Sequence, residues 1–381
     1  MFCVFFGLNF MRLILSVLLL LTSFCSFGQV NSSIQHDGLT RGFVYYTPSN
    51  WNANQQLPLL VVLHGLTQTG NGLMDITDFN TIAEDNNFIV CYPDGINNSF
   101  NANMNVTVST ADDLGFIEAL FAYFEQDLNS DPLKRYLSGF STGGFMCHKL
   151  ACESSLCIAA IATVSGNMSD TVYTNCSPNN LTSVLHIHGT TDPVVSYNGS
   201  PTSGVSVDST IEKWRNYLGC AMTPNMIAMP NNNPFDLSYP ERYTYSSCGN
   251  YSLELIKITG GGHQWPGIAT LVGGLGNINM DFFSPQIIWE FLENKSCPSS
   301  VSINKEELYS INIHPSPTSD QIAIDIKGYN GRINIEVYDL HGRLLETTTN
   351  TTVSLKKRAK GIYVFRVSYG DITEMVRVVR E

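Results

Sequence analysis

Short apolar runs of four to seven residues recur along the first three quarters of the chain and predict buried β-strands. One of them, Leu59–Leu63, has no polar interruption, which is typical of a central strand covered on both faces. The predicted strands cover residues 41–46, 59–63, 88–92, 135–138, 158–164, 184–188 and 253–258.

Between these runs, apolar residues spaced three and four apart predict amphipathic helices. The clearest spans 110–128, where Asp113 follows Thr110 by three residues as in a capping box. The pair Asp131-Pro132 is expected to end the connection to the next strand. Further helices are expected after residue 142 and over 207–218 and 283–292. Strands and helices thus alternate through residue 294, which predicts an α/β fold with a mainly parallel sheet wrapped by helices.

The C-terminal part of the chain has strand patterns but no helical spacing. Pro298-Ser299-Ser300 has the composition of a linker, and turns such as 329–331 and 341–342 separate the segments beyond it. This pattern predicts a small all-β sandwich of about 70 residues, a size that can fold alone. Its predicted strands are 322–326, 333–338, 363–367 and 374–379.

Charge changes at the same place. The chain has a formal net charge of −12 at pH 7, yet residues 309–381 hold ten basic and eight acidic residues, which leaves eleven basic and twenty-five acidic residues upstream. We therefore predict an α/β domain at 33–298, a linker at 299–308 and the β domain at 309–381. The acidic balance argues against nucleic acid or anionic membranes as partners.

The N-terminus has the features of a secretory signal peptide. Arg12 precedes the apolar run Leu13–Leu21, and Ser26-Phe27-Gly28 closes it with a small-x-small pattern. We predict a signal peptide over residues 1–28 with cleavage before Gln29, and hence a secreted chain. The apolar run is too short for a stable membrane span.

Eight cysteines lie beyond the predicted signal peptide, an even number that favours disulfides in an exported protein. Cys220 and Cys248 flank an Asn/Pro-rich insertion and are the preferred pair, and Cys157 with Cys176 is a weaker one. Cys147 is expected to be a buried packing residue. The sequence has no C-x-x-C pair and no Cys/His set with zinc-site spacing, so no metal site is predicted.

A G-x-S-x-G pattern, Gly139–Gly143, stands between a predicted strand and a predicted helix. Such a turn is tight, and small residues on either side of the serine let the strand and helix pass close together. Ser141 is therefore the candidate nucleophile. The Thr142 N–H, at the start of the helix, would point at the space where an oxyanion forms in acyl transfer. Alone, the pattern also fits a glycine-rich turn with an incidental serine.

A serine nucleophile needs a base and a carboxylate that orients the base. His263 follows three glycines after a predicted strand, and Asp192 follows another predicted strand. Both are expected on loops at one edge of the sheet. The chain order Ser141, Asp192, His263 is that of α/β-hydrolases.

Alternatives remain for two of these assignments. Asp170 or Asp208 stays open as the acid, because Asp192 also fits a turn former before proline. His186 and His188 share one strand face, but two ligands do not make a metal site, so a structural role is the favoured interpretation.

The segment His64-Gly65-Leu66 ends the strand that, in this kind of fold, donates the second oxyanion N–H. The Leu66 N–H would therefore pair with the Thr142 N–H, and only its backbone matters there.

Five motifs stand in order over residues 40–296, namely 63–68 (LHGLTQ), 92–95 (YPDG), 139–144 (GFSTGG), 188–192 (HGTTD) and 260–267 (GGGHQWPG). Together they resemble the secreted polyhydroxybutyrate depolymerase / feruloyl esterase family of α/β-hydrolases. The resemblance implies that Ser141, Asp192 and His263 are a catalytic triad, that Leu66 stands at the oxyanion position, and that Trp265 borders the acyl pocket. The family commonly has a cysteine where this chain has leucine, which leaves the N–H in place. No cofactor is expected.

The tail segments 313–317 (IHPSP), 337–343 (VYDLHGR) and 361–363 (GIY) resemble the C-terminal sorting domain of type IX secretion in Bacteroidetes. The family's usual asparagine between the two prolines is Ser316 here. The resemblance implies the type IX secretion machinery as a partner and a secreted or cell-surface location.

These observations predict a secreted serine carboxylic-ester hydrolase that acts on ester groups of extracellular polymers. Feruloyl or acetyl esters of plant polysaccharide are the favoured substrates, and polyhydroxybutyrate is the alternative. A non-catalytic surface binding protein that keeps the hydrolase fold is the competing class, against which the complete set of three candidate residues argues.

Overall fold

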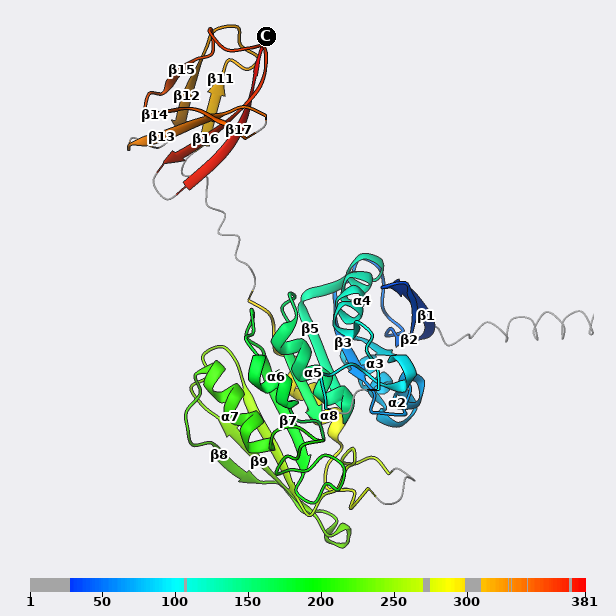
Figure 1. Cartoon of the computed structure of the whole chain (residues 1–381). Coiled ribbons are helices and arrows are strands. Elements are labelled where there is room, and N and C mark those ends of the chain that lie inside the picture. Colours follow the sequence, from blue (N-terminus) through cyan, green and yellow to red (C-terminus); the bar gives the residue numbers. More distant parts are fainter. Residues whose placement is uncertain are drawn as a thin grey trace, which may run out of the picture. The chain divides into compact units, whose positions relative to one another are not determined.

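The chain divides into two compact units, Met1–Pro298 and Ser299–Glu381 (Figure 1). The computed structural model describes residues 28–105, 108–269, 275–298, 310–327, 329, 331–340, 342–369 and 372–381. Residues 1–27 of the predicted signal peptide and the whole predicted linker lie outside the described residues, so both stay predictions.

A ten-stranded sheet forms the centre of the N-terminal unit, in the order β1-β2-β4-β3-β5-β6-β7-β10-β9-β8. Strands β4, β3, β5, β6, β7 and β10 run parallel to their neighbours within this group, and the strands outside it are antiparallel. The mainly parallel sheet is therefore confirmed. The bounds are β1 Gln29–His36, β2 Leu39–Tyr46, β3 Leu57–Leu63, β4 Ile89–Pro93, β5 Ser130–Phe140, β6 Ala160–Val164, β7 Ser183–Gly189, β8 Asn225–Ala228, β9 Tyr239–Tyr245 and β10 Leu253–Thr259.

Helices cover both faces of this sheet. The helices are α2 Gly70–Thr77, α3 Phe79–Asn86, α4 Asp113–Asp127, α5 Thr142–Glu153, α6 Asp170–Asn175, α7 Val207–Leu218 and α8 Ser284–Leu292, with short 3-10 turns at Ile96–Asn98 and Pro234–Asp236. Apolar residues of α4, α5 and α7 belong to one buried layer, and those of α2, α3 and α8 belong to another. The fold is thus a three-layer α/β architecture.

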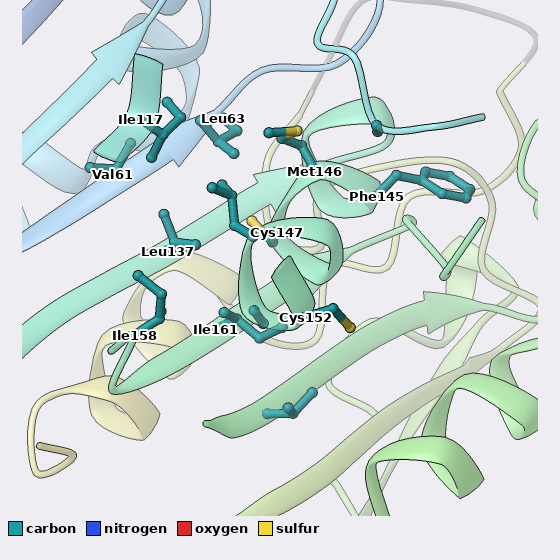
Figure 2. Packing of buried hydrophobic residues seen from close by; sticks show 14 of the residues in the cluster. Val61, Leu63, Ile117, Leu137, Phe145, Met146, Cys147, Cys152, Ile158 and Ile161 are labelled. Carbon is teal, nitrogen blue, oxygen red and sulfur yellow. The ribbon is translucent and has the colours of Figure 1, made fainter. Parts of the chain in front are cut away.

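Strand β3 explains why its run of apolar residues is unbroken. Val61 and Leu63 belong to the layer beneath α5, whereas Leu60 and Val62 belong to the opposite layer. Figure 2 shows the first of these layers, with Val61 and Leu63 of β3 and Cys147 of α5 among its side chains. Each such side chain, once buried, contributes about 1.5–3 kcal/mol to stability. The prediction of a strand covered on both faces is confirmed.

One predicted boundary was wrong. Asp131-Pro132 does not end a connection but lies inside β5. The pairing of β5 with β3 is irregular there, between the partners Leu57 and Leu59. A proline is tolerated at such a position because the ladder does not require its missing N–H.

Three disulfides form among the described residues, and the weaker of the two predicted pairs was wrong. Cys176 bonds to Cys152, not to Cys157. Helix α6, which ends just before Cys176, lies against α5 and so brings this cysteine to the C-terminal end of α5. Cys157 lies beyond that end and bonds to Cys297 instead.

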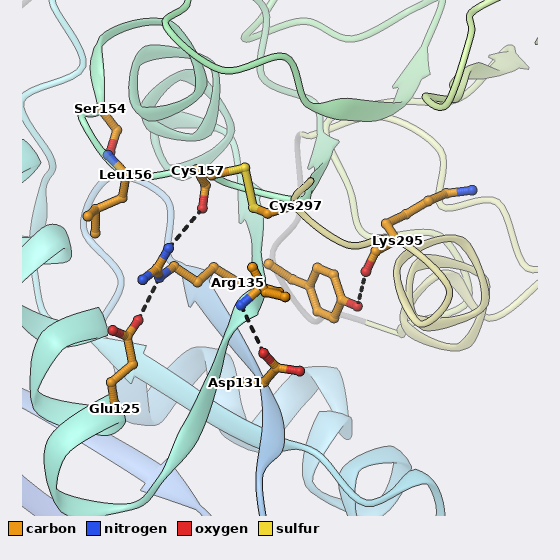
Figure 3. Close-up of a disulfide and its surroundings, with 10 residues drawn as sticks. Glu125, Asp131, Arg135, Ser154, Leu156, Cys157, Lys295 and Cys297 are labelled. Atoms are coloured by element: carbon orange, nitrogen blue, oxygen red, sulfur yellow. Dashed lines mark hydrogen bonds and ion pairs between the residues drawn. A yellow bond between two sulfur atoms is a disulfide. The ribbon is translucent and has the colours of Figure 1, made fainter. Parts of the chain in front are cut away.

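The Cys157–Cys297 disulfide joins two segments 140 residues apart in the chain (Figure 3). Arg135 of β5 donates from Nη1 to the Cys157 carbonyl oxygen at 3.3 Å and from Nε to Glu125 at 2.6 Å. The Cys297 N–H donates to the Leu133 carbonyl oxygen at 2.7 Å. The end of the N-terminal unit is thereby fixed to the central sheet.

The preferred disulfide prediction is confirmed, because Cys220 bonds to Cys248. Cys147 is a buried free thiol, also as predicted. Burial in apolar surroundings raises the pKa of its thiol, which makes it a packing residue rather than a nucleophile.

The C-terminal unit contains two antiparallel sheets, ordered β11-β12-β15 and β14-β13-β16-β17. Alternate apolar residues such as Ile324, Ile335 and Phe365 from both sheets form one buried core. The predicted small β sandwich is confirmed. Its strands are β11 Ser310–His314, β12 Gln321–Lys327, β13 Ile333–Tyr338, β14 Leu344–Thr348, β15 Thr352–Ser354, β16 Gly361–Tyr369 and β17 Ile372–Arg380.

Candidate active site

The candidate residues follow four of the parallel strands. Leu66 follows β3, Ser141 follows β5, Asp192 follows β7 and His263 follows β10. Because the carboxyl ends of parallel strands meet at one edge of a sheet, these segments share that edge. Chain segments more than a hundred residues apart are therefore brought into one region.

Ser141 occupies a strained turn between β5 and α5. Its backbone has φ 52° and ψ −120°, a conformation that non-glycine residues rarely adopt. A Cβ atom at Gly139 would come within 2.3 Å of the Gly143 carbonyl oxygen, and one at Gly143 within 2.1 Å of the Leu63 carbonyl oxygen. Glycine is therefore required at both positions, as the G-x-S-x-G pattern predicts.

Asp192 and His263 form a buried hydrogen bond. His263 Nδ1 lies 2.8 Å from Asp192 Oδ2, and the two side chains are 5 % and 0 % exposed. The other carboxylate oxygen, Oδ1, accepts the Val194 N–H at 2.8 Å and the Val195 N–H at 2.7 Å. Because a carboxylate oxygen can only accept, Nδ1 carries a proton in this arrangement, and Nε2 is the ring nitrogen left to act on the serine.

The two alternative acids form hydrogen bonds with other residues. Asp170 Oδ2 accepts from Asn105 Nδ2 at 3.2 Å, and Asp208 Oδ1 accepts from the Tyr197 hydroxyl at 3.4 Å. His263 forms its carboxylate hydrogen bond with Asp192. The geometry thus favours Asp192 as the partner of the imidazole.

His263 lies close to the elbow but does not hydrogen-bond to its hydroxyl. The His263 ring centroid is 4.8 Å from that of Phe140, the residue before Ser141. Among the described residues no hydrogen bond joins Ser141 Oγ to His263. Hydrogen bonds between catalytic groups are often long without substrate and shorten when substrate binds.

The loop after β3 packs directly against the elbow. A Cβ atom at Gly65 would lie 3.2 Å from Ser141 Cβ, and the Gly65 N–H donates to Gln68 Oε1 at 2.9 Å. In the described part of the chain, the N–H groups of Leu66 and Thr142 donate no backbone hydrogen bond. Both N–H groups are thus available as donors, as the predicted oxyanion site requires.

His64 holds this loop in place, a role that the sequence analysis missed. Its Nε2 accepts the Gly95 N–H at 3.0 Å, and its Nδ1 lies 2.7 Å from the Gly65 carbonyl oxygen. Since the carbonyl can only accept, Nδ1 carries the proton. Burial lowers the pKa of His64, so the ring is neutral near pH 7. The sequence signal for the contact between His64 and Gly95 was the YPDG motif, because Gly95 is the glycine of that motif.

Trp265 does not line an open pocket. Its side chain is 1 % exposed and stacks on Phe140 with ring centroids 5.9 Å apart, while Phe79 meets it edge-on at 6.3 Å. It therefore supports the His263 loop from the core side. This burial does not favour the predicted substrate contact, because the side chain is covered by its own neighbours.

No three His, Cys, Asp or Glu side chains in the described ranges come together in a way that would hold a metal ion. His186 and His188, the pair weighed in the sequence analysis, are buried within β7. Likewise, none of the described helices is long and apolar enough to cross a membrane.

The fold and the arrangement of this edge define the class as an α/β-hydrolase with a C-terminal β domain. Residues 125–214, which include the elbow, match the family described as Phospholipase/Carboxylesterase. Residues 312–381 match the Secretion system C-terminal sorting domain.

Three individual proteins are similar to this chain. The chain is 26 % identical over 282 residues to a bifunctional acetylxylan esterase/xylanase of Neocallimastix patriciarum, covering 72 % of this chain and 36 % of that protein. It is 25 % identical over 229 residues to feruloyl esterase B of Piromyces equi, covering 57 % and 41 %. A solved acetyl xylan esterase from Aspergillus awamori aligns with a TM-score of 0.46 at 17 % identity, covering 61 % of this chain and 94 % of that one.

The resemblance inferred from the motifs is therefore confirmed. The N-terminal unit has the α/β-hydrolase fold and is similar to feruloyl and acetylxylan esterases, and residues 312–381 of the C-terminal unit match the sorting domain. The chain spans less than half the length of these two curated relatives. The sorting domain and the disulfides identify a secreted or cell-surface protein.

Proposed function

We propose that this protein is a secreted serine esterase. Ser141 Oγ attacks an ester carbonyl carbon while His263 Nε2 takes the hydroxyl proton, and Asp192 holds the imidazole in the required tautomer. The Leu66 and Thr142 N–H groups stabilise the oxyanion. His263 returns the proton to the leaving alcohol, and water then releases the acid from Ser141 by the reverse sequence.

The observation that carries this proposal is the buried 2.8 Å contact between Asp192 and His263 at the same sheet edge as a strained serine elbow. A binding protein that only kept the fold would have no need for a serine at φ 52° or for a buried carboxylate on an imidazole. Both features require stabilisation from the rest of the structure.

The relatives favour esters on plant polysaccharide as substrates, because two of them are named feruloyl and acetylxylan esterases. A cavity of about 570 Å³, lined by Asn105 of the segment between β4 and α4 and by segments that follow β6 and β7, supports the same class. Its wall is rich in amide, hydroxyl and carboxylate groups that suit sugar hydroxyls, among them Asn105, Asp170, Asn198, Ser200, Ser206 and Ser209. Polyhydroxybutyrate, which has no hydroxyl groups along its chain, is the alternative.

Two measurements test the proposal. The mature chain is incubated with a fluorophosphonate probe and with p-nitrophenyl acetate, beside Ser141→Ala. We expect labelling and turnover for the natural sequence and neither for the variant; a natural chain that does not label or turn over is a binding protein. Methyl ferulate, acetylated xylan and polyhydroxybutyrate are then compared. A preference for the polyester would replace the polysaccharide assignment and keep the esterase.

A further inference from the structure

Three histidines lie in the interior of the N-terminal unit, and the mechanism proposed above uses none of them. His148 is on α5, and His186 and His188 are on β7; each is at most 1 % exposed. Their rings stack in series, with centroids 5.7 Å apart for the first pair and 5.3 Å for the second. Both nitrogens of a buried imidazole need partners, and their partners lead to the candidate triad.

At the end of the series next to the candidate triad, the contacts of His188 determine which of its ring nitrogens carries the proton. His188 Nε2 lies 2.8 Å from the Val195 carbonyl oxygen and 3.5 Å from Asp192 Oδ2. Both oxygens only accept, so Nε2 carries the proton and Nδ1 of the neutral ring is an acceptor. That Nδ1 lies 3.2 Å from His186 Nε2, which must therefore carry its own proton.

The contacts at the opposite end of the series imply the same direction of hydrogen-bond donation. Trp214 Nε1, which can only donate, lies 3.1 Å from His148 Nδ1, so the proton of His148 is on Nε2. His148 Nε2 lies 3.5 Å from Thr163 Oγ1, the longest link of the series, and the His148 ring also faces the Gly166 carbonyl oxygen. Thr163 Oγ1 lies 2.7 Å from His186 Nδ1. Since His186 Nδ1 is an acceptor, the Thr163 hydroxyl donates to it.

Burial keeps the rings uncharged. Loss of solvation lowers the pKa of His148 to about 3 and that of His188 to about 4, and it lowers the pKa of His186 as well. Near neutral pH each ring therefore has one donor and one acceptor nitrogen, which is the state that the direction of the chain needs.

We propose that these side chains form a one-way hydrogen-bond chain that positions the candidate acid Asp192. The chain runs from Trp214 through His148, Thr163, His186 and His188 to the Asp192 turn. The inference rests on the proposed function, since it treats Asp192 as the triad acid. The residues of the chain do not touch substrate; they are positioning residues.

Val195 links the chain to the acid. Its N–H donates to Asp192 Oδ1 at 2.7 Å, and its carbonyl oxygen accepts from His188 at 2.8 Å. The turn that carries Asp192 is thus held from behind by β7, and Oδ2 is left facing His263. Because an error of about 1 Å in a catalytic group can reduce a rate about a hundredfold, such a support has a measurable role.

The first test reads the tautomers directly, in the resting protein without substrate. Nitrogen-15 NMR of the imidazole rings should show His148, His186 and His188 protonated at Nε2 and not at Nδ1. His64 is an internal control of opposite sign, because its Nδ1 carries the proton. An Nδ1–H tautomer in any of the three would overturn the chain. This result does not depend on esterase activity, so it separates failure of the chain from failure of the proposed function.

The second test uses turnover of p-nitrophenyl acetate. His188→Ala should lower kcat on the order of ten- to a hundredfold with little change in KM. In His188→Gln the side-chain amide can replace the Nε2 donor, so it should recover most of that loss. If the glutamine variant is as slow as the alanine variant, hydrogen bonding by His188 does not position the acid.

A distal variant covers the case in which His188→Ala does not fold. Trp214→Phe keeps a ring and removes the donor that starts the chain; it should lower kcat several-fold and give His148 a mixture of tautomers. Trp289→Phe is the matched control, since Trp289 is equally buried but its Nε1 has no partner among the described atoms. Equal effects of the two tryptophan variants, or an unchanged His148 tautomer, would contradict the proposal.

Discussion

The two units of this protein are stabilised in different ways. The sorting unit has a core of aliphatic and aromatic side chains between two small sheets, and its sequence contains no cysteine. The hydrolase unit adds three disulfides, the buried Arg41–Asp113 ion pair and a row of buried histidines to its apolar layers. Burial of polar groups costs stability unless each is paired. In the hydrolase unit the row of buried histidines is paired in this way and reaches the candidate acid Asp192.

The largest difference between the units should be in activity. Ser141→Ala should reduce ester hydrolysis by on the order of 10⁴-fold or more, because no other group replaces the nucleophile. Deleting residues 309–381 should leave kcat/KM for a small ester unchanged. Both are measured with p-nitrophenyl acetate. A comparable loss in the truncated chain would mean that the sorting unit takes part in the reaction.

The next largest effect should be confined to the sorting unit. Phe365 is fully buried at the centre of its core, so Phe365→Ala should destabilise that unit by about 3–5 kcal/mol. A unit of this size has little stability in reserve. Its melting transition should be lost while that of the hydrolase unit stays, as seen by calorimetry. Leu344→Ala, at a side chain 49 % exposed, is the control and should change little.

Removal of a disulfide should lower the stability of the hydrolase unit alone. Replacing Cys157 and Cys297 together by serine opens a covalent loop of 140 residues, which should cost about 2–5 kcal/mol. Chemical denaturation should show a lower midpoint for the hydrolase transition and an unchanged one for the sorting transition. Loss of both transitions in parallel would show that the units do not unfold independently.

Low pH should also affect the stability of the two units differently. In the folded hydrolase unit the pKa of His148 is about 3 and that of His188 about 4, whereas an unfolded histidine titrates near 6.5. Below about pH 6.5 the unfolded chain therefore binds more protons than the folded one, and stability falls as pH is lowered towards 4. Glu153, whose pKa burial raises, acts in the opposite direction, but it is one partly buried group against several.

We expect the melting temperature of the hydrolase unit to fall by on the order of 5 °C between pH 7 and pH 4.5. Among its described residues the sorting unit has no buried histidine, so its transition should move less. Calorimetry at several pH values checks both. Parallel shifts would remove the histidines as the cause.

The smallest effect concerns the substrate. Asn198 is an exposed residue in the wall of the polar cavity beside β6 and β7. Asn198→Ala should lower kcat/KM for acetylated xylan about two- to fivefold, the value of one lost hydrogen bond, and leave p-nitrophenyl acetate unaffected. An equal effect on both esters would indicate damage to the active centre rather than to a sugar contact.

Much of the fold could be predicted from the sequence, because the central strands are covered on both faces and so have continuous apolar runs. Strand β8 was missed for the converse reason, since all four of its residues are exposed. The pairing of Cys176 was wrong because it depends on how α6 lies against α5, which no spacing along the chain encodes.

For the site, the G-x-S-x-G glycines indicated the elbow because the turn physically requires them. The sequence did not show which side of the loop Trp265 would take, and it is buried. The two histidines of β7 were visible as one strand face, but the rest of the network comes from other elements. Thr163 donates to His186, and Trp214 donates to His148. Such a network exists only after the elements pack.

The covalent bond at Cys297 has a consequence for the export of this protein. It lies only two residues before the start of the second unit and is attached through Cys157 to the segment between α5 and β6. After a cut beyond residue 298, an exopeptidase that shortens the new C-terminus would stop at Cys297, because the disulfide holds this residue to Cys157. A pulling force on the tail would act on the central sheet through this bond rather than unwind α8. Cleavage at this junction would therefore leave a C-terminus that the disulfide protects from further shortening.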